Sequence, residues 1–196
     1  MRHGVCFLLV AAFLGVTLSA DDSDRLLTID HYVRVMSTVP AIAGQPAQLY
    51  VRERVLAGGA LRTSSFGDRV VLFVHGAGTP AEVAFDVPFK DYSWMGFLAK
   101  AGYDVFSMDM TGYGRSTRPA AMGDPCNLSR EQQLTFVPAL LAKPCEPSYA
   151  QQMTTLASDW NDINSVVEHV LALRHVDKVA HANLGEQLPT VAMLSR

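Results

Sequence analysis

The sequence has no run of lysines and arginines, no Cys-x-x-Cys or histidine-rich spacing, and no apolar stretch as long as a membrane-spanning helix. The first absence argues against a nucleic-acid partner and the second against a metal site, and no other cofactor is expected. The remaining composition suits a globular domain with a real core, because 49% of the 196 residues are hydrophobic, 18% are charged and the net charge is −3.

The first 20 residues predict a secretory signal peptide. A short positive start precedes an apolar run of 12 residues at positions 5–16, and small residues follow before Asp21. A spanning helix needs about 20 apolar residues, so no stable membrane span is expected after cleavage. The mature protein would be secreted or periplasmic. An uncleaved N-terminal anchor is the alternative, because Leu18 is a poor residue three places before a cut after Ala20.

Export determines how the three cysteines are interpreted. Cys6 would leave with the signal peptide, so Cys126 and Cys145 would remain as an even pair in an oxidising compartment. Such a pair predicts a disulfide, which would close a loop of about 20 residues and contribute roughly 3 kcal/mol. Two free buried thiols are the alternative.

The order of apolar patterns predicts an α/β fold. Residues 31–39 and 48–56 alternate apolar with polar residues, as half-buried strands do, and 70–74 form a continuous apolar run that suits a strand covered on both faces. A short helix is expected near 92–101, ended by a glycine, followed by a strand that starts at 103 and ends at Asp109. Strand, helix and strand in this order predict a parallel pair.

The second half of the chain departs from this alternation. Residues 117–150 are rich in proline and polar residues around a short helical piece, which predicts an insertion, pinned by the cysteine pair, that could act as a lid. An amphipathic helix is expected over 153–174, with Ser158 and Asp159 near its cap. A buried strand is then due, but residues 180–196 form an atypical tail.

Three segments carry a resemblance to the α/β-hydrolase fold family. They are VVLFVHGAG at 70–78, YDVFSMDMTGYGRS at 103–116, and the helix leading to VDKV at 176–179. They resemble the third strand with its His-Gly loop, the fourth strand with its Asp-x-x-Gly-x-Gly-x-Ser turn, and the approach to the fifth strand. DPCNLS and DWNDI look like a secreted bacterial branch with a cysteine-tied insertion. The resemblance covers residues 28–179 and implies an incomplete α/β-hydrolase sheet within a partial domain at 21–196.

The resemblance gives the His-Gly loop a chemical role. In such enzymes the residue after His-Gly donates a backbone N–H to the oxyanion of an acyl-transfer intermediate, which here points to Ala77, with Gly78 as the alternative. Each such donor contributes about 3 kcal/mol to lowering the barrier. Gly76 and Gly78 would let the backbone approach a ligand closely. His75 is expected to hold the loop by hydrogen bonding, with proton transfer as the alternative.

The second motif is expected to be structural. Gly112 and Gly114 would permit a tight turn, Asp109 would accept hydrogen bonds from that turn, and Arg115 and Ser116 would tie it down. Ser116 is not expected to be a nucleophile, because it does not lie in a Gly-x-Ser-x-Gly sequence.

No catalytic nucleophile, acid or histidine is identifiable. Gly-x-Ser-x-Gly occurs nowhere, and the family would place its serine near Gly185, where neither serine, cysteine nor aspartate is present. His169, His175 and His181 come too early to be the catalytic base, and Ser195 has no surrounding elbow. A truncated, frameshifted or decayed hydrolase that departs from the family after Val179 would explain this pattern.

These observations predict an α/β-hydrolase family protein, by resemblance an exported serine hydrolase of ester or related bonds, inactive as given. The substrate would be a small molecule. Apolar side chains in the insertion favour an apolar substrate but serve equally as a small core: Leu134, Phe136, Leu140 and Leu141. The first alternative is a non-catalytic exported binding protein with a hydrolase-like pocket, and the second is half of a complex completed by another chain. The oligomeric state stays open.

Overall fold

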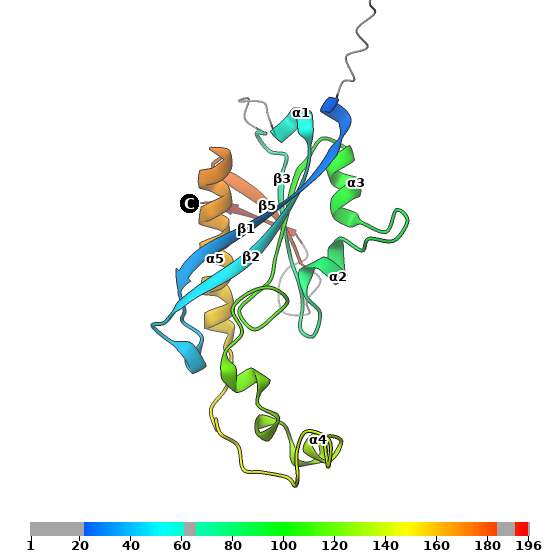
Figure 1. Ribbon diagram of the computed structural model, residues 1–196. Helices are drawn as coiled ribbons and strands as arrows, with labels where there is room; N and C mark the ends of the chain where they lie inside the picture. Colours follow the sequence, from blue (N-terminus) through cyan, green and yellow to red (C-terminus); the bar gives the residue numbers. More distant parts are fainter. Residues whose placement is uncertain (1–21, 61–65, 184–190, 196) are drawn as a thin grey trace, which may run out of the picture.

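The computed structural model describes residues 22–60, 66–183 and 191–195. A mixed six-stranded sheet with the order β1-β2-β4-β3-β5-β6 forms its centre (Figure 1). β3 pairs in parallel with β4 on one side and β5 on the other, while β1, β2 and β6 join antiparallel. The strands are β1 Leu26–Met36, β2 Pro46–Leu56, β3 Val70–Val74, β4 Asp104–Met108, β5 Lys178–Asn183 and β6 Val191–Ser195.

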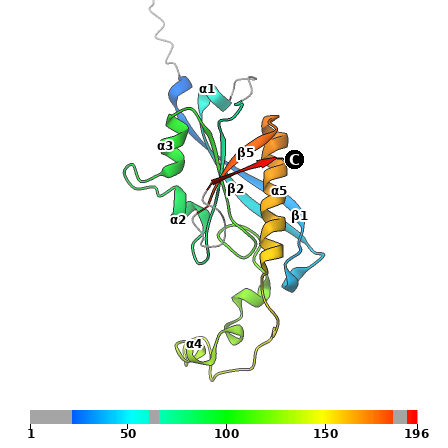
Figure 2. The ribbon, with the colours of Figure 1, turned by 180° about the vertical axis from the view of Figure 1, so that it is seen from behind.

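Helices cover the two faces of this sheet. The long α5, Leu156–Arg174, packs on one face, and α2, Ala81–Phe85, and α3, Trp94–Lys100, lie on the other, as the opposite views of Figures 1 and 2 show. The remaining elements are α1 Ala57–Ala60, α4 Arg130–Leu134 and short 3-10 turns at Asp22–Asp24, Pro40–Ile42, Ala120–Gly123 and Pro125–Asn127. Within the described ranges no helix is long and apolar enough to cross a membrane.

The α/β class, the parallel pair and the cysteine-tied insertion expected from the sequence are confirmed. The prediction of two half-buried strands is correct only for β1, whose residues alternate in exposure. β2 is buried along most of its length because it lies between β1 and β4 and is packed by helices on both faces. The Arg52 and Glu53 side chains are therefore internal, which the alternating pattern did not predict.

Two boundaries also differ from the sequence expectation. α5 begins at Leu156, and its cap is Thr155, whose side chain accepts a hydrogen bond from the Ser158 N–H while the Ser158 side chain accepts one from the Thr155 N–H. Ser158 is therefore the third helical residue and not the cap. The fifth strand extends to Asn183, so the start of the tail that looked atypical pairs in register with β3.

The continuous apolarity of β3 has a direct explanation in the packing. Leu72 and Val74 belong to the cluster that contains α5, while Val71 and Phe73 belong to the cluster that contains α2 and α3. Alternate residues of a strand point to opposite faces, so a strand with helices on both faces buries every side chain. β3 is thus fixed from both sides, and so is the loop that leaves its carboxyl end.

A buried group of charges lies where β2, β4 and the end of α5 meet. The carboxylates of Glu53 and Asp104 are fully buried, and the Arg174 guanidinium forms ion pairs with both. His31 Nε2 lies 2.7 Å from Glu53 Oε2. Burial and, second, the neighbouring Glu53 raise the pKa of Asp104 to about 7. Arg174 therefore compensates two carboxylates that have no access to water.

Replacing Arg174 tests this compensation. We expect Arg174→Met to lower the free energy of unfolding by about 3–5 kcal/mol at pH 8, because two buried carboxylates lose their cation. The loss should shrink toward pH 5, since the pKa of Asp104 is already raised and a protonated carboxyl needs no cationic partner. Urea unfolding across this pH range measures both effects. Arg34→Met, on the exposed side of β1, is the matched control; an equal loss in both variants, or a loss independent of pH, would contradict the interpretation.

Candidate functional site

The candidate site lies at the carboxyl ends of the neighbouring parallel strands β3 and β4. The His75 loop leaves β3 and the Asp109 turn leaves β4, so the topology brings both motifs to one edge of the sheet. Two contacts join them directly. The Met110 N–H donates to His75 Nε2 at 3.1 Å, and the Tyr113 ring packs on the imidazole with centroids 4.5 Å apart.

His75 has both ring nitrogens engaged inside this loop pair. Because the Met110 N–H donates to Nε2, the neutral ring carries its proton on Nδ1, which donates to the Gly76 carbonyl at 2.8 Å. The side chain is almost fully buried, and burial lowers its pKa below the ordinary value for histidine. The imidazole is held neutral, with no ring nitrogen directed toward solvent, which suits loop positioning rather than proton transfer.

Ala77 and Gly78 lie at the exposed tip of the loop. None of the described residues accepts a hydrogen bond from the Ala77 N–H, while the Gly78 N–H lies 3.4 Å from the Tyr113 hydroxyl, a long contact. Gly78 has φ +86, a conformation that side chains of L-residues disfavour, and no atom would obstruct a Cβ there. The loop thus presents one free backbone donor and one weakly engaged donor side by side.

Asp109 fixes the second loop to the first helix after β3. Its buried carboxylate accepts from the Ala81 N–H at 2.8 Å through Oδ1 and from the Arg115 N–H at 2.9 Å through Oδ2. Gly114 lies so close that a Cβ built on it would meet Asp109 Oδ2 at 1.9 Å. Charge-assisted hydrogen bonds of this kind are short and strong, so the carboxylate sets the position of both backbones.

Ser116 joins the same turn to β2. Its buried hydroxyl donates to the Asp109 carbonyl at 2.6 Å and accepts from the Tyr50 N–H at 2.8 Å. The Arg115 side chain forms ion pairs with Asp30 and Glu82, both at 3.1 Å. With its proton committed to a carbonyl and no adjacent base, the Ser116 hydroxyl has no route to nucleophilic activation.

Sequence reasoning missed two contributors to the site. Asp162, from α5, is buried and accepts from the Thr111 N–H at 2.8 Å, and its burial raises its pKa. Arg118 donates to the carbonyls of Gly112 and Met122, which ties the turn to the start of the insertion. Asp162 lies beside the core residue Ile163 and four residues before the core residue Val166. A polar residue at such an inward-facing position of an amphipathic helix was the available sequence signal.

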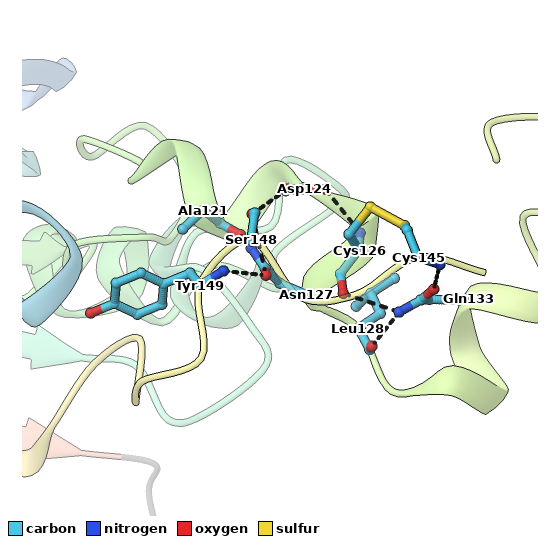
Figure 3. Close-up of a disulfide and its surroundings, with 9 residues drawn as sticks. All are labelled: Ala121, Asp124, Cys126, Asn127, Leu128, Gln133, Cys145, Ser148 and Tyr149. Carbon is cyan, nitrogen blue, oxygen red and sulfur yellow. Dashed lines mark hydrogen bonds between the residues drawn. A yellow bond between two sulfur atoms is a disulfide. The ribbon is translucent and has the colours of Figure 1, made fainter. Parts of the chain in front are cut away.

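The Cys126–Cys145 disulfide closes the insertion, as predicted (Figure 3). The buried Gln133 amide reinforces it, because Nε2 donates to the carbonyls of Cys126 and Leu128 and Oε1 accepts from the Cys145 N–H. Asn127 makes a similar bridge, accepting from the Tyr149 N–H at 2.9 Å. The insertion is therefore internally cross-linked, although the part around α4 projects away from the sheet (Figure 1).

A pocket of about 520 Å³ lies between the two loops and the base of the insertion. Gly78, Pro80 and Tyr113 line it from the loops, Met122 and Leu128 line it from the insertion, and Met153 closes it before α5. None of the four apolar insertion residues that favoured an apolar substrate contributes to this lining. Leu134 and Leu140 are exposed on the projecting part, and the pocket lining also includes the polar side chains of Arg118, Asp124 and Asn127, so the structure gives no support to an apolar substrate.

The histidines set aside by the sequence argument lie outside this pocket. His175 ends α5 in the left-handed region with φ 51, His169 packs edge-on against His31, and His181 is buried in β5. Burial lowers the pKa of His169 and of His181. Among the described residues no group of three histidine, cysteine or carboxylate side chains could hold a metal ion. The signal peptide and the expected serine position near Gly185 lie outside the described residues.

Comparison with known proteins gives structural neighbours only. No protein-family model and no curated protein matches the sequence. Among solved structures, the chain is similar to brefeldin A esterase, a bacterial homologue of human hormone-sensitive lipase, at 16% identity and TM-score 0.38, covering 89% of this chain and 34% of that one. It is also similar to esterase E22, at 10% identity and TM-score 0.40, covering 81% of this chain and 40% of that one. The chain thus spans less than half the length of either esterase.

A methyl group at position 114 tests the Asp109 turn. We expect Gly114→Ala to lower the free energy of unfolding by more than about 2 kcal/mol, because the Cβ collides with the buried carboxylate and the residue has φ +45. Gly78→Ala, with positive φ but open space, should lose only about 1 kcal/mol. Gly123→Ala, with neither constraint, should be nearly neutral. Urea unfolding ranks the three, and a Gly114→Ala variant as stable as Gly123→Ala would show that Asp109 does not fix the turn.

Proposed function

We propose that residues 75–78 form the oxyanion side of a serine-hydrolase active site of the α/β-hydrolase type, and that the protein as given binds small ester-like molecules without hydrolysing them. The observation that carries this proposal is the free Ala77 N–H beside the Gly78 N–H, at the carboxyl end of β3 and next to a pocket of about 520 Å³. Two adjacent backbone donors in a fixed loop are what a developing oxyanion requires.

The surrounding contacts support this role by making the loop rigid. His75 holds the loop from inside with both ring nitrogens, and Asp109 anchors the beginning of α2 immediately after it. Donors that are already oriented stabilise charge without reorganising, which is the source of their catalytic value. A loop that needed ordering on binding would lose much of that advantage.

We expect no hydrolysis by the chain as given, for a reason that lies in its sequence. An acyl-enzyme mechanism needs an activated nucleophile with a base oriented by a third group, and neither Gly-x-Ser-x-Gly nor a suitably placed acid and histidine occurs in this chain. Ser116 cannot substitute, because its hydroxyl is committed to the Asp109 carbonyl. Oxyanion donors alone would therefore bind a carbonyl or acid oxygen without starting the reaction.

The wider assignment is an exported serine hydrolase of ester or related bonds that this chain represents in part. The disulfide supports export, because such bonds persist in oxidising compartments. The alternative, an exported binding protein that retained a hydrolase-like pocket, is supported by the same oxyanion loop. The nucleotide sequence beyond codon 179 distinguishes them: a Gly-x-Ser-x-Gly elbow in another frame favours truncation, and none in any frame favours a binding protein.

Hydrolysis of p-nitrophenyl butyrate tests the catalytic half of the proposal. We expect turnover by the full chain to equal that of Ser116→Ala, and we expect no labelling by a serine-directed fluorophosphonate, because no serine is activated. Cooperative urea unfolding of the same sample shows that it is folded. Covalent labelling of any serine, or turnover abolished by Ser116→Ala in a folded protein, would overturn the assignment.

A further inference from the structure

The segment from α2 to α3 carries an unusual concentration of exposed apolar side chains. Five of them are between 58% and 68% exposed: Val83, Phe89, Tyr92, Trp94 and Phe97. Four of the five are aromatic, and all lie within one short stretch of chain. We call these five residues the aromatic surface. None belongs to either of the two core clusters of the described residues.

The backbone beneath the aromatic surface is well anchored. α3 buries Met95 and Ala99 against the sheet, which turns Trp94 and Phe97, three residues apart, to the outside together. Ser93 caps α3 by accepting from the Gly96 N–H and donates its hydroxyl to Asp86 at 2.6 Å. The exposure is therefore enforced by packing on the opposite side of the helix.

The connection between α2 and α3 carries two of these aromatic side chains, Phe89 and Tyr92. It projects from the body of the protein in both views (Figures 1 and 2). Phe89 and Tyr92 in this connection have nearly parallel rings, 7° apart in orientation with centroids separated by 6.0 Å. Lys90 Nζ lies 5.3 Å from the Phe89 ring centroid. Its alkyl stem can cover apolar surface while its ammonium group reaches water.

The N-terminal end of the described chain lies beside α3, on its buried side. Leu26, the first residue of β1, packs into the cluster that contains α3, and its side chain approaches Gly96. The described residues begin at Asp22, close to the same end of the molecule, and the apolar run of residues 5–16 precedes them in the sequence. While attached, this run would bring α3 near any bilayer that it enters.

We propose that the aromatic surface inserts into the interfacial layer of a phospholipid bilayer. Tryptophan and tyrosine favour that layer because their rings are apolar at one end and polar at the other, and lysine side chains reach from it to the aqueous side. Lys90 lies on the connection, and Lys100 ends α3 with its Nζ 3.9 Å from the carboxylate of the exposed Asp91. This surface is separate from the pocket at the carboxyl ends of β3 and β4, so membrane contact does not depend on the proposed function.

Trp94 supplies a direct measurement in the full chain. The protein has two tryptophans, and Trp160→Phe on α5 leaves Trp94 as the reporter. Phosphatidylcholine vesicles with brominated acyl chains quench only a ring that enters the bilayer. We expect Trp94 emission to shift to the blue and to be quenched. Phe97→Ser and Phe89→Ser should each weaken vesicle partitioning roughly tenfold, because each removes a large apolar side chain from the inserted face.

Leu140→Ser is the matched control, because Leu140 is equally exposed but lies on the projecting insertion. It should leave partitioning unchanged. Trp94 that stays unquenched on vesicles to which the chain is bound would overturn the proposal, since the N-terminal run alone would then carry binding. So would failure to bind vesicles, equal weakening by Leu140→Ser, or a blue shift that depends on protein concentration without lipid, which would indicate a second copy of the chain on this surface.

Discussion

The hydrogen bonds of the Asp109 carboxylate are the contacts on which the candidate site depends. One oxygen holds the start of α2, which follows the His75 loop, and the other holds the turn after β4. Gly114 is required beside it because no side chain fits against those oxygens. A single buried anion, solvated by backbone N–H groups, therefore sets the relative position of the two loops that form the pocket.

Around the Asp109 carboxylate, three further buried polar side chains have hydrogen-bond partners in the protein. His75 satisfies both ring nitrogens within the loops, Ser116 uses its hydroxyl twice, and Asp162 accepts from the Thr111 N–H. Unsatisfied buried polar groups are costly, so these bonds leave the loops little freedom to rearrange. The Ala77 N–H differs, because it is exposed at the tip without a protein acceptor. The Ala77 N–H is thus available to a ligand while His75 and Asp109 fix the backbone on either side of it, which is the arrangement expected of a binding group.

Local sequence signals predicted much of this arrangement. The apolar run of β3, the glycines of the turn and the cysteine pair were readable because each depends on neighbours in the chain or on composition. Contacts between residues far apart in the sequence could not be predicted in this way. Asp162 reaches Thr111 over 51 positions, and Arg174 reaches Glu53 over 121, so neither partner could be identified from a pattern. The sequence predicts β2 to be half-buried because its apolar and polar residues alternate. That pattern does not indicate whether the sheet face that carries the polar residues is itself covered by helices. The extent of β5 was not predicted for a related reason. Residues 180–183 are only modestly apolar, and they form a strand because they pair with β3.

The central claim is that Ala77 and Gly78 present backbone donors to a ligand oxygen. The most direct test follows their amide resonances by NMR while a monoalkyl phosphonate anion, a tetrahedral stand-in for the oxyanion, is titrated into the ¹⁵N-labelled protein. We predict that these two amides shift most and move downfield as they donate, with saturable dependence on ligand. A titration in which both stay unchanged while the ligand binds elsewhere, or does not bind, would contradict the account.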